Sequence, residues 1–326
     1  RELWHEALDR LAEEAPDTLL LAEGFWLMEA YLARNLGMHR VYHGTFMHRL
    51  RVEDNTGFRR ALVSALAFDR RLAGSFTNYL TNPDEEPAVV QLGKGDKYFA
   101  LTTLLATLPG LPLFGHGQAE GLVERYGMDY RKARFDEDPD PRFLARHRRE
   151  IAPLLRKRSC FAEVTGFQLL VFEPGGPGKA DDVLAFVNRC DTGAVLVAVH
   201  NHGGTTRGRL HRTDATVGGP ALDLATALGL DTGSKVFHPW WDPRTGEGWL
   251  LETAALARRG LDLDLGPYGT RVMLAGEALH DRPDGALPRL CEELAGRAVS
   301  DLGARLDALG YEAAAPDPPG AGDEES

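Results

Sequence analysis

The chain has 326 residues, of which 43% are hydrophobic and 26% charged, enough for about two domains of roughly 150 residues with cores of their own. Its 48 acidic and 37 basic residues give a net charge of −11, and only residues 142–158 are locally Arg-rich, which argues against the basic stripe of a nucleic-acid-binding protein. No apolar run reaches the roughly 18 residues of a membrane span, so we expect neither a nucleic-acid nor a membrane partner.

The three cysteines stand far apart and lack the spacing of a disulfide framework or a zinc site. We therefore expect a reducing, cytoplasmic location, with no metal site and no cofactor. The cysteines are Cys160, Cys190 and Cys291.

Helix and strand patterns alternate in the first half of the chain. Apolar residues fall on one face in the helical segments, and short apolar runs mark buried strands. Repeated βα units of this length are typical of a parallel sheet, and four strands make half of an eight-stranded barrel. In chain order, we predict helix 1–15, strand 18–23, helix 27–37, strand 40–45, helix 58–72, strand 75–80, helix 96–108 capped by Asp96, strand 111–114 and helix 141–157.

The second half contains short β-rich runs at 167–172, 182–187, 194–200 and 270–274, separated by Gly, Pro and Asp clusters. This pattern predicts an antiparallel β-sandwich, followed by an amphipathic helix over about 287–309. The acidic, Pro- and Gly-rich end is expected to be disordered. We divide the chain into a half-barrel of α/β type at 1–159, an antiparallel β-sandwich at 160–280, a C-terminal helix at 281–314 and a tail at 315–326.

Side chains that can bind or act on a substrate follow three of the four predicted parallel strands. These strands end in the segments "LLLAEGFW", "NYLTNPDEEPA" and "PGLPLFGHGQAEG". In parallel α/β barrels the active site lies at the C-terminal ends of the strands, so a functional role is considered first. The candidates are Glu23 with Phe25 and Trp26, Asn82 with Asp84, and Gln118 with Glu120.

Each of these residues also has a structural explanation. A single acid near a strand end is commonly a loop residue or part of a salt bridge, and this interpretation stays open for Glu23. Asp84, beside Glu85 and Glu86, is equally compatible with a solvated loop. A functional interpretation gives Glu23 a definite task, because a carboxyl behind four apolar residues is partly desolvated, which raises its pKa and suits a general acid.

Taken together, these segments resemble the α-amylase family of glycoside hydrolases. "PGLPLFGHGQAEGL" resembles the end of that family's eighth barrel strand, "TNPDEEP" its seventh-strand Asn-His-Asp and "LAEGFW" its fifth-strand segment. "LDLGPYGTRVML" is similar to the closing strands of its C-terminal sandwich, so the resemblance spans about residues 1–274. It implies strands five to eight of a TIM-type barrel and an oligo- or polysaccharide substrate with α-linked glucose units.

The resemblance also implies individual roles. Glu23 would be the acid/base, Asp84 would grip substrate hydroxyls and stabilise the transition state, and Asn82 would support Asp84. The further substrate-binding candidates are Phe25, Trp26, Gln118 and Glu120.

The sequence departs from the family pattern at two of these positions. Pro83 stands where the family has a histidine, which removes a donor to a sugar hydroxyl and stiffens the loop. Ala119 follows Gln118 where the family has a glutamate, and Glu120 comes one place later, which leaves the role of Glu120 in doubt. "VAVHNHGG", around Asn201, weakly resembles a first-strand segment, but it falls in the predicted sandwich, and we assign it no role.

A nucleophile is absent from the expected segments. The family uses a carboxylate after strand four in a Gly-Phe-Arg-x-Asp setting, and no such segment occurs here. Retaining glycosidases need two carboxyl groups roughly 5–5.5 Å apart, so we expect the N-terminal half of the barrel as a partner and this chain alone to be inactive. Hydrolysis and transglycosylation use the same residues, and a non-catalytic carbohydrate-binding or scaffolding descendant is the alternative.

Overall fold

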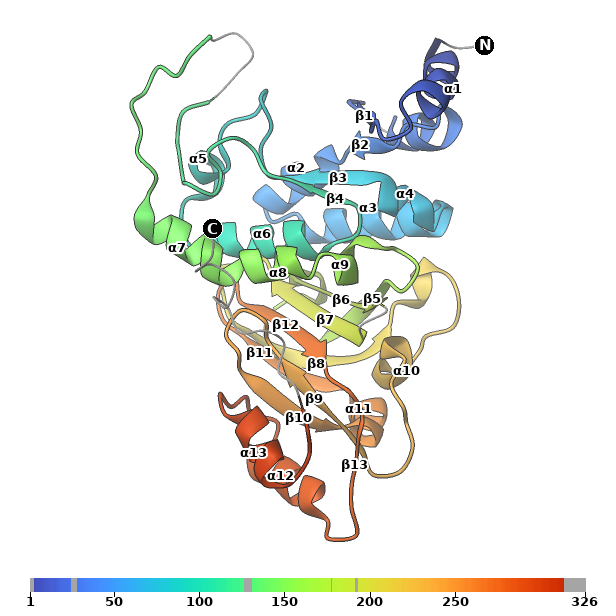
Figure 1. Ribbon diagram of the computed structural model, residues 1–326, viewed down its shortest axis with the longest axis vertical. Helices are drawn as coiled ribbons and strands as arrows, with labels where there is room; N and C mark the ends of the chain where they lie inside the picture. Colours follow the sequence, from blue (N-terminus) through green and yellow to red (C-terminus); the bar gives the residue numbers. More distant parts are fainter. Residues whose placement is uncertain (1–2, 25–27, 126–130, 177, 191–192, 314–326) are drawn as a thin grey trace.

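A four-stranded parallel sheet forms the first part of the computed structural model, which describes residues 3–24, 28–125, 131–176, 178–190 and 193–313 (Figure 1). The strands neighbour one another in the order of the sequence, as consecutive βα units of a barrel wall do, whereas a doubly wound sheet would extend on both sides of its first strand. The predicted parallel α/β character is therefore confirmed. The strands are β1 (Leu21–Ala22), β2 (Arg40–Tyr42), β3 (Phe76–Tyr79) and β4 (Leu111–Leu113).

The register of these strands separates a core face from an open face. Ala22 pairs with Val41 and Val41 with Phe76, and all three contact the core beneath the sheet. Side chains alternate along a strand, so Tyr42 lies on the opposite face. Because Glu23 follows Ala22 as Tyr42 follows Val41, the two residues leave neighbouring strands at the same carboxyl edge.

Several helices start or stop where local hydrogen bonds require it. Strand 40–45 ends early, because helix α2 already begins at Gly44. The expected helix 58–72 is two helices, since the Asp69 carboxylate accepts a hydrogen bond from the Arg71 N–H and starts a new one. Helix 141–157 is likewise broken at Ile151, two residues before Pro153, whose ring cannot continue the hydrogen-bond ladder.

The expected cap of helix 96–108 is wrong. Gly95 occupies the N-cap position, and the Asp96 carboxylate instead accepts a hydrogen bond of 2.8 Å from Arg146. The helical elements of this part are α1 (Leu3–Glu14), the π-helix η1 (Tyr31–Asn35), α2 (Gly44–Arg51), α3 (Asn55–Phe68), α4 (Arg70–Ser75), α5 (Ala88–Leu92), α6 (Asp96–Thr107), α7 (Pro141–Glu150), α8 (Ala152–Arg156) and α9 (Ser159–Ala162).

The second part is antiparallel, as predicted, and its strands join into one curled nine-stranded sheet. The order is β10-β9-β12-β7-β6-β5-β8-β11, with β13 paired to β9. The strands are β5 (Gln168–Pro174), β6 (Val183–Cys190), β7 (Gly193–His200), β8 (Thr206–Thr213), β9 (Val236–Trp241), β10 (Gly248–Glu252), β11 (Leu261–Leu265), β12 (Thr270–Ala275) and β13 (Leu279–His280), with helical turns η2 (Ala180–Asp182), η3 (Ala215–Val217), α10 (Leu224–Leu228) and α11 (Thr253–Arg259).

The predicted single C-terminal helix is wrong. Two helices, α12 (Ala286–Leu294) and α13 (Leu302–Ala308), replace it. Ala295 and Gly296 between them have φ of 48° and 74°, in the left-handed region that ends a helix. Both helices pack on β10 through a core of their own.

One hydrophobic core joins the two sheets. Leu184 and Phe186 of β6 face the parallel part and pack in the same cluster as Leu101 of α6 and Phe161 of α9. The alternate residues of β6 face a second core inside the curled sheet. Figure 1 shows α6, α8 and α9 lying between the parallel sheet and strands β6 and β7.

Asn201 is part of this junction. Its Nδ2 donates to the Leu50 carbonyl at 3.0 Å and to Asn55 Oδ1 at 2.7 Å, and Asn55 Nδ2 donates back to the Asn201 carbonyl at 2.9 Å. Asn201 is 2% exposed, so these contacts tie the curled sheet to α2 and α3. The segment "VAVHNHGG" thus belongs to the curled sheet and its junction with α2 and α3, and none of its residues lines the pocket at the strand ends.

Candidate functional site

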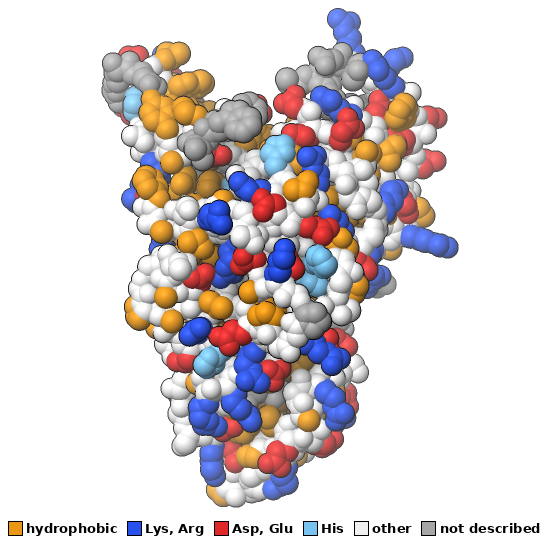
Figure 2. Space-filling view, turned by 180° about the vertical axis from the view of Figure 1, so that it is seen from behind, with side chains coloured by type: hydrophobic (Ala, Val, Ile, Leu, Met, Phe, Trp, Pro, Cys, Tyr) orange, Lys and Arg blue, Asp and Glu red, His pale blue; other side chains and the backbone are white. Residues whose placement is uncertain are grey.

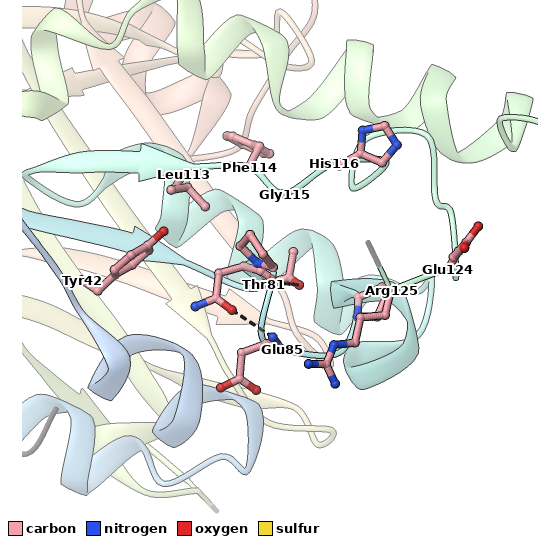
Figure 3. A pocket seen from close by; sticks show the side chains of 12 residues that line it. Tyr42, Thr81, Glu85, Leu113, Phe114, Gly115, His116, Glu124 and Arg125 are labelled. Carbon is pink, nitrogen blue, oxygen red and sulfur yellow. Dashed lines mark hydrogen bonds between the residues drawn. The ribbon is translucent and has the colours of Figure 1, made fainter. Parts of the chain in front are cut away.

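A pocket of about 270 Å³ opens at the carboxyl edge of the parallel sheet (Figure 3). Tyr42 enters it from the end of β2, Asn82 from the segment after β3, and Phe114 from the segment after β4. The face in Figure 2 is hollowed at its top, and its acidic and basic side chains are interspersed below. Of the three strand ends singled out from the sequence, those after β3 and β4 meet at this pocket, whereas Glu23 after β1 is not among the residues that line it.

The Asn82 side chain shapes the loop after β3. Its Oδ1 accepts hydrogen bonds from the backbone N–H groups of Asp84, at 3.0 Å, and Glu85, at 2.9 Å. Such a turn stabilises a compact loop and fixes the direction of the side chains that follow. Glu85 is half-buried and lines the pocket, whereas Asp84 is exposed and is not among the lining residues.

Glu23 and Asp84 both influence the pKa of the Tyr42 phenol. Burial raises the pKa of Tyr42, and the negative charges of Glu23 and Asp84 raise it further. Burial also raises the pKa of Tyr79 to about 12, with Glu85 and Glu23 adding to the effect. Both tyrosines are thus neutral hydrogen-bond donors at pH 7. Glu23 itself is exposed, so the expected desolvation of its carboxyl is not found.

The remaining predicted residues lie apart from this pocket or outside the described residues. Phe25 and Trp26 belong to the latter group. Gln118 is 3% exposed, and its Oε1 accepts a hydrogen bond of 3.0 Å from the Gly115 N–H, so it holds the turn after β4. Glu120 lines a different pocket of about 490 Å³, beside His147 and helices α7 and α8.

Sequence reasoning missed residues that complete the pocket. Tyr42 ends its strand as the candidates do, and its place at a strand end was the available signal. His48 follows β2 and was considered near the site, with a structural role favoured; it stands on helix α2 outside the pocket lining, with Nε2 3.9 Å from Glu85 Oε1. Arg125 lines the pocket, with its guanidinium 4.0 Å from the Glu86 carboxylate. No local sequence pattern predicts this position.

The described part of the chain contains no cluster of three or more His, Cys, Asp or Glu side chains arranged to bind a metal ion. Across the same residues, none of the helices combines the length and apolar character needed to cross a bilayer.

Comparison with known proteins adds information on the fold. No family model and no curated protein matches the sequence. Among solved structures, 83% of this chain superimposes on 53% of the Nostoc punctiforme debranching enzyme, at a TM-score of 0.55 and 15% identity. The fold is that of α-amylase-type enzymes. The expected structural resemblance is thereby confirmed.

Two further structures give the same result. An Anoxybacillus α-amylase matches 83% of this chain over 55% of its own length, at a TM-score of 0.52 and 14% identity. A maltogenic amylase from S. marinus matches 83% over 33%, at the same score and identity. The chain spans about half the length of the first two structures.

Proposed function

We propose that this chain contributes the substrate pocket and the acid/base of a retaining glycosidase or transglycosidase that acts on α-linked glucosides. The observation that carries the proposal is the pocket at the carboxyl edge of the parallel sheet, which Tyr42, Asn82 and Phe114 line from the ends of three neighbouring strands. The substrate class is supported by the structural neighbours, which are named as a debranching enzyme and amylases.

In this proposal, Glu23 protonates the leaving glycosidic oxygen and later deprotonates the incoming water or sugar hydroxyl. Asp84 stabilises the positive charge that develops on the sugar ring, and Asn82 holds the Asp84 backbone in place. Tyr42 is a neutral donor, because burial and the charges of Glu23 and Asp84 raise its pKa. A sugar bound over the pocket would also shield Glu23 from water.

The nucleophile would come from strands that complete the barrel. Among the described strands, β1 and β4 each pair on one side only, which leaves both edges of the parallel sheet open. Closing such a sheet into a barrel requires further parallel strands, and their carboxyl ends would face the same pocket. We propose that this complementary part supplies the attacking carboxylate.

A second candidate function is carbohydrate binding or scaffolding without catalysis. It is favoured by the Glu120 side chain, which faces a separate pocket, and by Pro83, which offers no donor to a sugar. The two functions differ in turnover, because a binding protein retains affinity for the sugar without cleaving it.

The deciding experiment measures cleavage of maltooligosaccharides by the polypeptide that carries the complementary strands. Loss of the acid should lower kcat by about 10²–10⁴-fold in Glu23→Gln while sugar binding is kept. Glu13→Gln, an exposed acid on α1, is the matched control and should retain full activity. Unchanged turnover in Glu23→Gln would remove the acid assignment, and binding without turnover in the parent protein would favour the second candidate.

A further inference from the structure

Glu85 lines the pocket, and His48 of α2 approaches it from outside the lining, with a side chain that is 54% exposed and no direct hydrogen bond between the two. Their nearest atoms, Nε2 and Oε1, are 3.9 Å apart, beyond the 2.7–3.2 Å range of a hydrogen bond between nitrogen and oxygen. At such a separation a third polar group can bridge the pair. The imidazole and the carboxylate thus offer a donor and an acceptor to one small group between them.

Both residues stand on backbone that is anchored locally. Asn82 Oδ1 binds the Glu85 N–H, and the Glu85 side chain is 30% exposed. His48 stands on α2, whose neighbouring residues Phe46 and Met47 are buried in the protein. The backbone of the pair is therefore placed by two independently anchored elements, and the two side chains remain accessible to a ligand.

The chemistry of the pair favours a hydroxyl group. A sugar hydroxyl both donates and accepts, so it can donate to the Glu85 carboxylate and accept from an imidazole N–H of His48. An anionic group would be repelled by Glu85 and by the neighbouring Asp84 and Glu86. A substrate rich in hydroxyls and without charge fits this position better than a phosphate or a carboxylate.

We propose that Glu85 and His48 together bind one hydroxyl of the substrate and make the pocket selective for the sugar ring that presents it. This inference rests on the proposed function and assigns it a specificity-determining pair. Glu85 and His48 act in binding, while Glu23 and Asp84 act in the chemical steps.

The test measures binding of maltoheptaose to the chain by titration calorimetry, with circular dichroism to verify folding. A hydrogen bond to a charged group is worth enough that Glu85→Gln should weaken binding about tenfold or more. His48→Ala should weaken it about fivefold, and the double variant should lose less than the product of the two single losses. Glu86→Gln removes the same charge one residue away and should stay within about twofold.

Each outcome bears on the inference. Parent-like binding by folded Glu85→Gln would overturn it while leaving the proposed function in place. Equal losses in Glu85→Gln and Glu86→Gln would also overturn it, because they would reflect a general charge effect. If the parent chain binds no maltoheptaose at millimolar concentration, the proposed substrate class and this inference both fall.

Discussion

His43 donates a hydrogen bond from Nδ1 to Oδ1 of Asn78, and the two atoms are 2.8 Å apart. Asn78 Nδ2 in turn donates to the Pro109 carbonyl at 3.0 Å, which fixes the orientation of the amide. His43 therefore carries its proton on Nδ1. The imidazole also stacks on Phe76 at 4.0 Å between ring centroids, so a neutral, buried histidine supports the ends of β2 and β3.

Burial makes stability depend on pH. It lowers the pKa of both His43 and His147 to about 4, whereas an unfolded histidine titrates near 6.5. The unfolded state therefore binds more protons between these values, and the free energy of unfolding should fall as the pH drops from about 6.5 to about 4. Urea midpoints at pH 7, 5.5 and 4.5 check this. The decline should be shallower in His43→Gln than in the parent, and a flat parent profile would contradict the prediction.

The pKa of Tyr42 reports whether Glu23 and Asp84 converge. Because each carboxylate raises it, Glu23→Gln and Asp84→Asn should each lower the Tyr42 pKa, while burial keeps it above 10. Titration of the tyrosine Cζ resonance by NMR, with folding monitored over the same pH range, measures both changes. Glu13→Gln should cause none. If Asp84→Asn left the Tyr42 pKa unchanged, Asp84 would lie outside the site.

Arg158 holds the turn that leads into β4. Its guanidinium donates to the carbonyls of Ala106 at 3.0 Å, Leu108 at 2.7 Å and Gly110. Burial lowers the Arg158 pKa to about 10, yet the group is charged at pH 7. Arg158→Met leaves these carbonyls unpaired and should cost about 2–4 kcal/mol in urea denaturation. Arg148→Met, at an exposed position on α7, should cost less than about 0.5 kcal/mol.

The reciprocal amide contacts of Asn55 and Asn201 predict energetic coupling across the junction of the two sheets. Either substitution by Ala leaves a buried partner unsatisfied and should cost about 1–3 kcal/mol. The double variant should lose less than the sum of the single losses, with a coupling of about 0.5–3 kcal/mol. Equilibrium unfolding of the four proteins completes the cycle. Strict additivity would show that the two amides act independently.

The parallel strands and their polar ends were predictable, because a buried strand is a continuous apolar run and its end is marked by the first polar residues. The direction of the side chains beyond that point was not. Glu85 rather than Asp84 lines the pocket because Asn82 accepts two backbone hydrogen bonds, and this turn depends on three-dimensional placement. Helix breaks at Asp69 and Ala295 were missed for a similar reason, since capping and left-handed backbone override the apolar periodicity.

Strand β8 was not among the predicted strands, although the exposure of its residues alternates along the strand. Arg207 and Arg209 alternate with less exposed residues and pair with Asp264 and Asp262 of β11. Such alternation is typical of a strand with one solvated face. The buried positions of this short, glycine-containing run include few large apolar residues, so its apolar pattern did not predict a strand.

Close packing requires a glycine at position 110 in the "PGLP" segment. Gly110 has a φ of +95°, and a Cβ atom there would lie 2.3 Å from the Phe76 carbonyl oxygen. Any other residue would push β4 away from β3. The segment that most clearly marks the family resemblance therefore serves to place the strand, and the chemistry depends on the residues after it.

The curled sheet supports the parallel sheet, and with it the pocket, through the hydrophobic core that the two sheets share. Leu184 and Phe186 share a core with α6, α9 and β3, so we expect a change of side-chain volume on β6 to shift the strands whose loops hold Asn82 and Phe114. The shape of the pocket can then be altered by substitutions far from its lining.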